Sequence, residues 1–186
     1  MLKTDNWLFK LILIFNILCI LVCDIASVKD IIDPASTPFM QVGGACSIVA
    51  LLAALYYILM GYSKNASAYY KLYGALYALS ALVSIFNVSH NNQATVYTTV
   101  LSALVFAFVL VMTLSRDLGK RNSFIICGLT FACAAIQVVL GFVDIPATNE
   151  EKPLIIIRLV AGVVMASMLG VMTFAKYVDK AQRHTK

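Results

Sequence analysis

The stretch 56-YYILMGYSKNASAYYKLYGALY-77 decides the fold, because it joins two long apolar runs through a short polar elbow at residues 63–67. Seven of the nine tyrosines of the chain lie in it, and Lys64 and Lys71 are its only charged residues. Tyrosine rings favour the lipid headgroup layer, and lysines in short loops favour the cytoplasmic side of a membrane. The stretch therefore predicts two membrane helices joined by a cytoplasmic elbow.

The overall composition agrees with a membrane environment. Of the 186 residues, 61% are hydrophobic and only 12% are charged, and the mean hydropathy is +0.89. Soluble domains carry about 45–50% apolar and about 25% charged residues. We therefore expect one transmembrane domain, 1–186, in contact with the lipid bilayer. The formal net charge of +5 does not indicate nucleic-acid binding, because the charges lie in loops and at the ends of apolar runs rather than along one face.

Six apolar runs follow one another along the chain, at 7–25, 39–62, 69–88, 95–115, 124–143 and 154–177. The run 39–62 would reach about 36 Å as a helix, enough to cross a hydrocarbon core of about 30 Å. The first run is open to two interpretations, a signal peptide or a retained helix, and the poor cleavage positions around Ala26 favour the retained helix. Residues 24–38 are expected to form a loop, and Gly119 to stop the fourth helix. The predicted fold is all-α, a bundle of six transmembrane helices.

The charges give an internal test of this topology, because six spans place alternate loops on alternate sides. The side that holds both termini carries 11 of the 14 basic residues and 3 acidic residues, a net charge of +8. The other side carries 3 basic and 6 acidic residues, a net charge of −3. Positive residues accumulate in cytoplasmic loops, so both termini are predicted to be cytoplasmic. The bias is typical of a cell membrane and suits a bacterial inner membrane, although Asn87-Val-Ser89 would be a luminal glycosylation sequon in a eukaryote.

Small residues recur every four positions on several of the predicted helices. Helices pack closely in lipid where small residues let their backbones approach. The pattern predicts packing seams inside the bundle, or a homo-oligomer contact, at Gly162, Ala166 and Gly170, at Ala50 and Ala54, at Gly74 and Ala78, and at Ala103 and Ala107.

Catalytic signatures are absent from the sequence. There is no HExxH, GxSxG, Asp-rich metal motif or phosphate-cradling glycine loop, and the five cysteines form no CxxC. The predicted topology puts His90 and His184 on opposite sides of the membrane, so they cannot share a ligand. We therefore expect no enzyme activity, no catalytic residue, no metal site and no cofactor.

Ionisable and amide side chains at membrane depth are the best candidates for a binding site. Asp144 closes the fifth run, Arg158 lies one turn into the sixth, and Asp24 closes the first at the same level. Together with His90 in the neighbouring outer turn, these residues are predicted to line the mouth of an outward-facing ligand site. The alternative is that Arg158 reaches the headgroups and the aspartates end helices in water.

Asn16 and Gln137 lie deeper, and each either bonds to another helix or forms the floor of a polar cavity. The hydroxyls of Ser80, Ser84, Thr113, Thr130 and Ser167 are expected to bond to carbonyls of their own helices.

Two functional hypotheses follow. One is a small-molecule transport or solute-binding membrane subunit with the outward-facing site just described. The other is a non-catalytic partner protein, for assembly, immunity or stress protection, that acts through helix packing and its basic cytoplasmic face. In size and span count the chain is similar to the substrate-binding subunits of energy-coupling vitamin transporters and to small six-span stress proteins, a likeness of gross architecture that many functions share.

Overall fold

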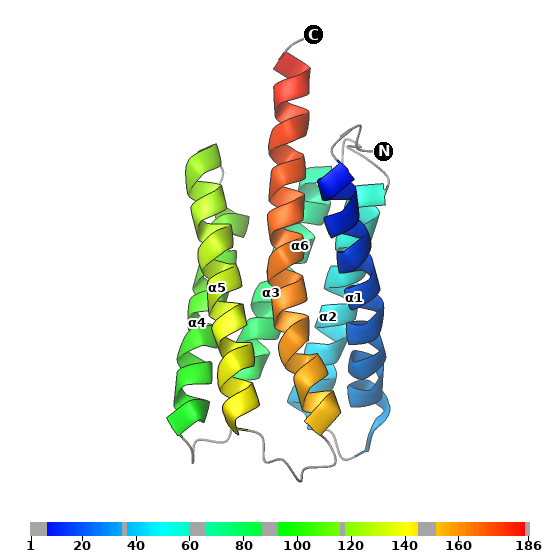
Figure 1. Cartoon of the computed structure of the whole chain (residues 1–186), viewed down its shortest axis with the longest axis vertical. Coiled ribbons are helices and arrows are strands. Elements are labelled where there is room, and N and C mark those ends of the chain that lie inside the picture. Colours follow the sequence, from blue (N-terminus) through cyan, green and yellow to red (C-terminus); the bar gives the residue numbers. More distant parts are fainter. Residues whose placement is uncertain are drawn as a thin grey trace.

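The computed structural model of the chain describes residues 7–34, 37–59, 66–86, 93–115, 118–144 and 152–184. In these ranges the chain forms no strand and six helices: α1 (Trp7–Ile32), α2 (Pro38–Leu59), α3 (Ala66–Phe86), α4 (Gln93–Leu114), α5 (Lys120–Asp144) and α6 (Lys152–His184). Consecutive helices run in opposite directions, so α1 begins at the end of the bundle where α6 ends (Figure 1). The predicted all-α class is confirmed, and the described part of each of the six apolar runs is helical, apart from Ser115.

The six helices form a closed ring, and α6 lies further inward than the other five. Neighbours in the sequence are neighbours in space, and α1 also packs against α6. In addition, α6 contacts α2 and α3. Met168, Leu169 and Met172 of α6 are fully buried as a result. The sixth helix is thus the element around which the others pack.

Local signals fix the helix ends. The Thr37 hydroxyl accepts a hydrogen bond from the backbone N–H of Met40 at 3.3 Å and so caps α2. Pro38 occupies the first helical position, where a missing N–H leaves no partner unsatisfied. At the end of α1, the N–H of Asp33 still bonds to the Lys29 carbonyl at 2.9 Å, and Pro34 follows it.

Two predicted boundaries were wrong. Residues 24–32 are helical, so Asp24 lies two turns inside α1 rather than at its end. The polar residues of this stretch suggested a loop, but nothing before Pro34 interrupts a helix there. Gly119 does not end α4, which already ends at Leu114. It lies directly before α5, where its carbonyl accepts the bond from the N–H of Ser123 at 3.0 Å.

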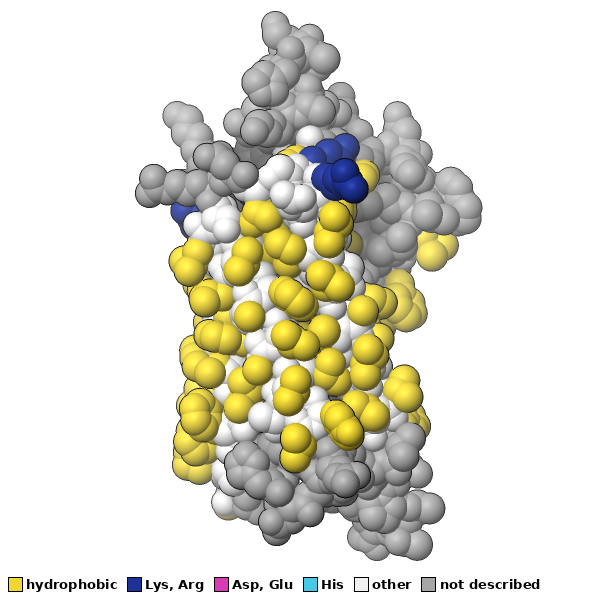
Figure 2. Space-filling model, turned by 90° about the vertical axis from the view of Figure 1, so that its left-hand side faces the viewer, with side chains coloured by type: hydrophobic (Ala, Val, Ile, Leu, Met, Phe, Trp, Pro, Cys, Tyr) yellow, Lys and Arg dark blue, Asp and Glu magenta, His cyan; other side chains and the backbone are white. Residues whose placement is uncertain are grey.

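The outer surface of the bundle is apolar along most of its length. Figure 2 shows a continuous belt of hydrophobic side chains, with Lys and Arg side chains only at its upper rim. Four of the described helices contain segments long and apolar enough to cross a membrane: Pro38–Tyr57, Val96–Leu114, Lys120–Phe142 and Val160–Tyr177. An exposed apolar surface of this extent would aggregate in water, and lipid is the solvent it fits. The chain is therefore compatible with a membrane protein.

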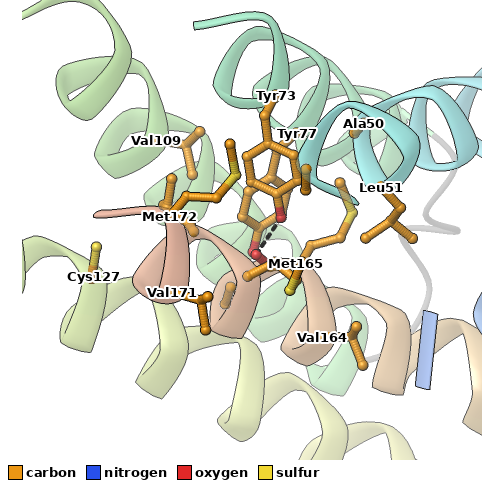
Figure 3. Packing of buried hydrophobic residues seen from close by; sticks show 14 of the residues in the cluster. Ala50, Leu51, Tyr73, Tyr77, Val109, Cys127, Val164, Met165, Val171 and Met172 are labelled. Carbon is orange, nitrogen blue, oxygen red and sulfur yellow. Dashed lines mark hydrogen bonds between the residues drawn. The ribbon is translucent and has the colours of Figure 1, made fainter. Parts of the chain in front are cut away.

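The tyrosines of the deciding stretch do not all have the interfacial role that the sequence suggested. Tyr57, Tyr70, Tyr73 and Tyr77 are buried inside the bundle. Their hydroxyls bond to α6: Tyr57 to the Met172 carbonyl at 3.5 Å, Tyr70 to the Thr173 hydroxyl at 3.1 Å, Tyr73 to the Met165 carbonyl at 2.5 Å and Tyr77 to the Gly162 carbonyl at 3.2 Å. Figure 3 shows the Tyr73 and Tyr77 rings lying side by side against α6. Tyrosine thus joins α2 and α3 to the central helix.

The predicted seams are confirmed on two helices. Ala50 and Ala54 of α2, and Gly74 and Ala78 of α3, are buried. A Cβ added at Gly74 would collide with the side chain of Thr113, so α3 and α4 approach closely there.

The other two seams differ from the prediction. Ala103 and Ala107 of α4 are exposed, so that seam was wrong. On α6 only Ala166 is buried against its neighbours, whereas a Cβ at Gly162 or Gly170 would meet nothing within 4 Å. A regular spacing of small residues therefore does not show which face of a helix is buried.

Candidate functional site

A partly open cavity of about 280 Å³, with a mixed polar and apolar lining, lies between the helices. Its walls come from five helices, α2 to α6. The lining residues are Ser47, Tyr77, Ser80, Ala81, Ser84, Thr98, Ser102, Val105, Gln137, Ala161, Gly162 and Met165. Six of these carry hydroxyls and one carries an amide, and none of these described lining residues carries a charge.

Small side chains make the space. Serine, alanine and glycine account for seven of the twelve lining residues. Gly162 is the clearest case, because a Cβ built there would meet no atom within 4 Å. On the other side, α4 makes no close approach to α6, so nothing from α4 fills the gap that Gly162 leaves.

Gln137 of α5 bridges the wall to α4. Its amide nitrogen donates to the Ser102 hydroxyl at 2.7 Å and to the Thr98 carbonyl at 3.1 Å. With the two amide hydrogens used in this way, the amide oxygen remains as an acceptor at the cavity wall. Gln137 thus bonds to a neighbouring helix and also lines the cavity, and its role in ligand binding stays a prediction.

The burial of the lining residues differs along the cavity. Ser47, Tyr77, Ser102 and Met165 at its inner part are all more than nine-tenths buried. Ser84, near the end of α3, is exposed. The one exposed residue of the described lining thus lies toward the end of the bundle where α3 ends and α4 begins.

Ser47 is the least satisfied of the buried hydroxyls in the wall. Its oxygen is 3.8 Å from the sulfur of Met165, its hydrogen-bond partner. A thioether is a weak acceptor, so the Ser47 hydroxyl retains most of its capacity to bond to a molecule in the cavity.

A second polar cluster continues from the cavity toward the other end of the bundle. Thr173 of α6 accepts from the thiol of Cys127 at 3.5 Å and bonds to the Tyr70 hydroxyl at 3.1 Å. Beyond it, the Tyr177 hydroxyl bonds to Ser123 at 2.8 Å and to the Leu118 carbonyl at 2.6 Å. The ring of Tyr73 lies 6.1 Å from the ring of Tyr77, which lines the cavity.

That far end of the bundle is basic, and we call it the basic end. The described charged side chains there are Lys71, Lys120, Arg121 and Lys176, all of them exposed. The ammonium of Lys176 lies 5.0 Å from the centre of the Tyr70 ring, within reach of a cation–π interaction. Asp24 and Lys29 of α1, and Asp33 directly after it, lie in the opposite half. The described side chains thus follow the charge bias that the sequence predicted.

The residues predicted for the ligand site fall in different places. Gln137 lines the cavity, whereas Asn16 is buried in α1 and is not part of the lining. Asp24 is half-buried, and its Oδ1 atom is shielded without a hydrogen-bond partner. Asp144 is the last residue of α5 and Arg158 lies within the first two turns of α6, but the side chains of both are outside the described residues. Their pairing at an outer mouth stays a prediction.

Most of the cavity residues were missed from the sequence. The hydroxyls of Ser84, Thr113 and Thr130 do bond to carbonyls of their own helices, at 2.7, 2.7 and 2.8 Å. Serine in a membrane helix is usually explained by such a bond. Nothing in the sequence therefore marks Ser80 as a cavity residue. The missing signal was the convergence of polar residues from four helices, α2 to α5, which no single helix displays.

No protein-family model, curated protein or solved structure matches this chain. Helical bundles serve many functions, so the fold names none of them. Among the described residues, no group of three or more histidine, cysteine, aspartate or glutamate side chains is placed to hold a metal ion. The polar cavity is consequently the best candidate for a functional site.

Proposed function

We propose that the chain is a multi-pass membrane protein that binds a small molecule in the polar cavity, as a transport protein or a solute-binding membrane subunit. The observation that carries the proposal is the cavity itself, about 280 Å³ of space lined by six hydroxyls and the Gln137 amide. Ligand sites are concave, partly apolar, and carry a few convergent polar groups, often between the helices of a bundle. Close-packed interiors leave few voids larger than a water molecule, so a polar space of this size suits an occupant.

In this proposal all six helices cross the bilayer, with both termini in the cytoplasm. Support comes from the exposed basic side chains Lys71, Lys120, Arg121 and Lys176, which share one end of the bundle. The positive-inside bias assigns that end to the cytoplasm. The cavity lies in the other half, since its lining comes from the last part of α3 and the first parts of α4 and α6. It would therefore open outward, and the protein would act without catalysis.

The test is thermal unfolding of the purified protein in detergent against a library of metabolites, vitamins and ions. A ligand at about 100 times its dissociation constant adds about 2.7 kcal/mol, which corresponds to a shift of about 5–10 °C for a chain of this size.

The matched variants are Gly162→Leu and Gly170→Leu. Both replace a glycine of α6 at which an added Cβ meets nothing within 4 Å, but only Gly162 lines the cavity. A stabilising ligand should act on the wild type and on Gly170→Leu, and should lose its effect on Gly162→Leu. Absence of any saturable ligand, or equal stabilisation of both variants, would contradict the proposal.

The basic end favours a second candidate, a partner protein that recognises an acidic surface. Four described basic side chains are exposed there, and no described acidic side chain lies beside them. Neutralising Arg116, Lys120 and Arg121 would then abolish function in the cell, whereas Gly162→Leu would not. The reverse pattern supports the solute-binding protein.

A further inference from the structure

We infer that the basic end of the bundle binds the headgroups of anionic phospholipids, through Lys71, Lys120, Arg121 and Lys176. The inference rests on the membrane insertion that belongs to the proposed function, but it does not depend on the cavity or on its ligand. It assigns a partner to a surface that the proposed solute site does not use.

Contacts of Lys176 join two of the helices at this end. Its ammonium group lies 5.0 Å from the centre of the Tyr70 ring in α3 and 6.0 Å from the centre of the Tyr177 ring in α6. A cation at such a distance is attracted to the face of an aromatic ring. Lys71 directly follows Tyr70 in the chain. The first turns of α3 and the last turns of α6 therefore bring two cations to the same end of the bundle.

The start of α5 adds two more cations. The Tyr177 hydroxyl of α6 bonds to the Ser123 hydroxyl of α5 at 2.8 Å. Lys120 and Arg121 lie in the same first turn of α5 as Ser123, and both are exposed. Hydrogen bonds and ring contacts between the helices thus hold four basic residues at one end, with α6 in their midst.

The positive charge of this end does not depend on the described side chains alone. Over the whole sequence, the side of the predicted topology that holds both termini carries 11 basic and 3 acidic residues, a net charge of +8. Pairing of every acidic residue on that side would still leave an excess of cations. Like charges held together on a fold repel one another, and a headgroup phosphate relieves this repulsion. Basic residues next to membrane helices attract anionic lipids for this reason.

Two of the cations head apolar stripes on the outer surface, which favours a lipid over other anionic partners. Residues four and eight positions apart lie on about the same face of a helix. On α3, Lys71 shares its face with Leu79, which is 40% exposed, and on α5 Arg121 shares its face with Ile125 and Leu129, which are 50% and 45% exposed. Figure 2 shows the same order, with Lys and Arg side chains at the rim of a hydrophobic belt. A phospholipid matches it, because its anionic headgroup lies above apolar chains, whereas a soluble anion would contact the cations alone.

The experiment follows thermal unfolding of the full chain in micelles of short-chain phosphatidylcholine, to which short-chain phosphatidylglycerol is added. We expect phosphatidylglycerol to raise the unfolding temperature saturably. The double variant Lys71→Gln, Arg121→Gln should unfold at about the wild-type temperature in phosphatidylcholine alone, because both side chains are exposed. Its apparent affinity for phosphatidylglycerol should be weaker by about 25-fold, since each basic residue near a membrane surface contributes about fivefold.

Two control variants separate recognition of the headgroup from a structural effect. Lys29→Gln removes an exposed cation from the opposite half of the bundle, and it should respond to phosphatidylglycerol like the wild type. The double variant Lys71→Arg, Arg121→Lys keeps both charges and should also respond like the wild type. Salt raised from about 50 mM to about 500 mM should weaken the wild-type response, because exposed charges are screened.

Three results would refute the inference directly. Phosphatidylglycerol might raise the unfolding temperature no more than an equal amount of added phosphatidylcholine does, Lys71→Gln, Arg121→Gln could respond like the wild type, or Lys29→Gln could lose the response equally. Two further probes identify another occupant. Glycerol 3-phosphate that reproduces the full effect would make this a site for a free phosphate. Polyglutamate that stabilises the wild type but not the neutralised variant, where phosphatidylglycerol fails, would make it a surface for an acidic protein. Both results overturn the lipid assignment.

The lipid site and the proposed solute site fail separately. Phosphatidylglycerol should stabilise Gly162→Leu as it stabilises the wild type, because Gly162 belongs to the cavity wall. Loss of the lipid response in Gly162→Leu would contradict a lipid site at the basic end. Absence of any cavity ligand would refute the proposed solute binding alone, and absence of a lipid response would refute this inference alone.

Discussion

Gly43 and Gly44 of α2 offer a test of the packing between α1 and α2. A Cβ added at Gly44 would lie 2.9 Å from the backbone oxygen of Ser27 in α1, whereas one at Gly43 would lie 3.4 Å from the Cγ1 atom of Val83. The first separation is closer than real Cβ atoms come to other atoms, and backbone cannot rotate away as a side chain can. The second is an ordinary van der Waals contact.

The two substitutions to alanine therefore differ in what the new methyl group meets. Each gains about 1 kcal/mol of helix propensity, because glycine is the poorest non-proline helix former. Gly44→Ala must also push α1 away from α2, and overpacking of this kind costs about 1–3 kcal/mol. We expect Gly43→Ala to be neutral or stabilising, and Gly44→Ala to be less stable than Gly43→Ala by about 1–3 kcal/mol.

The assay is reversible unfolding in mixed micelles, followed by circular dichroism, with Gly128→Ala as the reference. An added Cβ at Gly128 meets nothing within 4 Å, so this variant reports propensity alone. Equal stability of Gly43→Ala and Gly44→Ala would refute the close approach of α1 to α2.

Three further substitutions probe the interior. Gly74→Ala should destabilise by about 1–3 kcal/mol, because the new methyl group meets the Thr113 side chain, and Thr113→Ala should restore most of the loss in the double variant. Tyr73→Phe should cost about 0.5–1.5 kcal/mol, since it removes the hydroxyl that donates to the Met165 carbonyl. Ala166→Leu should lower the unfolding temperature by several degrees, because Ala166 is 1% exposed on the central helix. All three are read by thermal unfolding in detergent.

Exposed positions supply the controls for these variants. Ala103 and Tyr97 are both exposed. Ala103→Leu and Tyr97→Phe should leave the unfolding temperature within about 2 °C of the wild type, since exposed substitutions change stability by about 0.5 kcal/mol or less. If they destabilise as much as Ala166→Leu and Tyr73→Phe, the assignment of buried faces is wrong.

Much of the fold could be predicted from hydropathy, because apolar runs bounded by Pro34, Pro38 and polar loops leave few alternatives to membrane helices. The end of α1 could not, since residues 24–32 are polar enough for a loop yet contain no helix breaker. The buried tyrosines were also misassigned. A tyrosine ring suits either the membrane interface or a buried site where a hydrogen-bond acceptor meets its hydroxyl. The contact of α6 with α3 places Tyr73 in a buried site of this kind, where the Met165 carbonyl is the acceptor.

The candidate site was only partly predictable. Gln137 stands out in the sequence because a mid-helix amide needs a partner, and the structure places it at the cavity. Ser47, Ser80 and Ser102 do not stand out, because each is an ordinary serine within its own helix. Their convergence depends on the rotation of three helices about their axes, and neither hydropathy nor small-residue spacing determines that rotation here.

The accessibility of the cavity is the most direct test of the outward-facing site. Ser80→Cys would be placed in a background without the five native cysteines and exposed to a membrane-impermeant thiol reagent in right-side-out vesicles, with Ala103→Cys as the lipid-facing control. We predict that Ser80→Cys reacts from the outside, that Gly162→Leu in the same chain blocks the reaction, and that Ala103→Cys stays unlabelled. A Ser80→Cys thiol that does not react, or that reacts only in inverted vesicles, would contradict an outward-opening polar cavity.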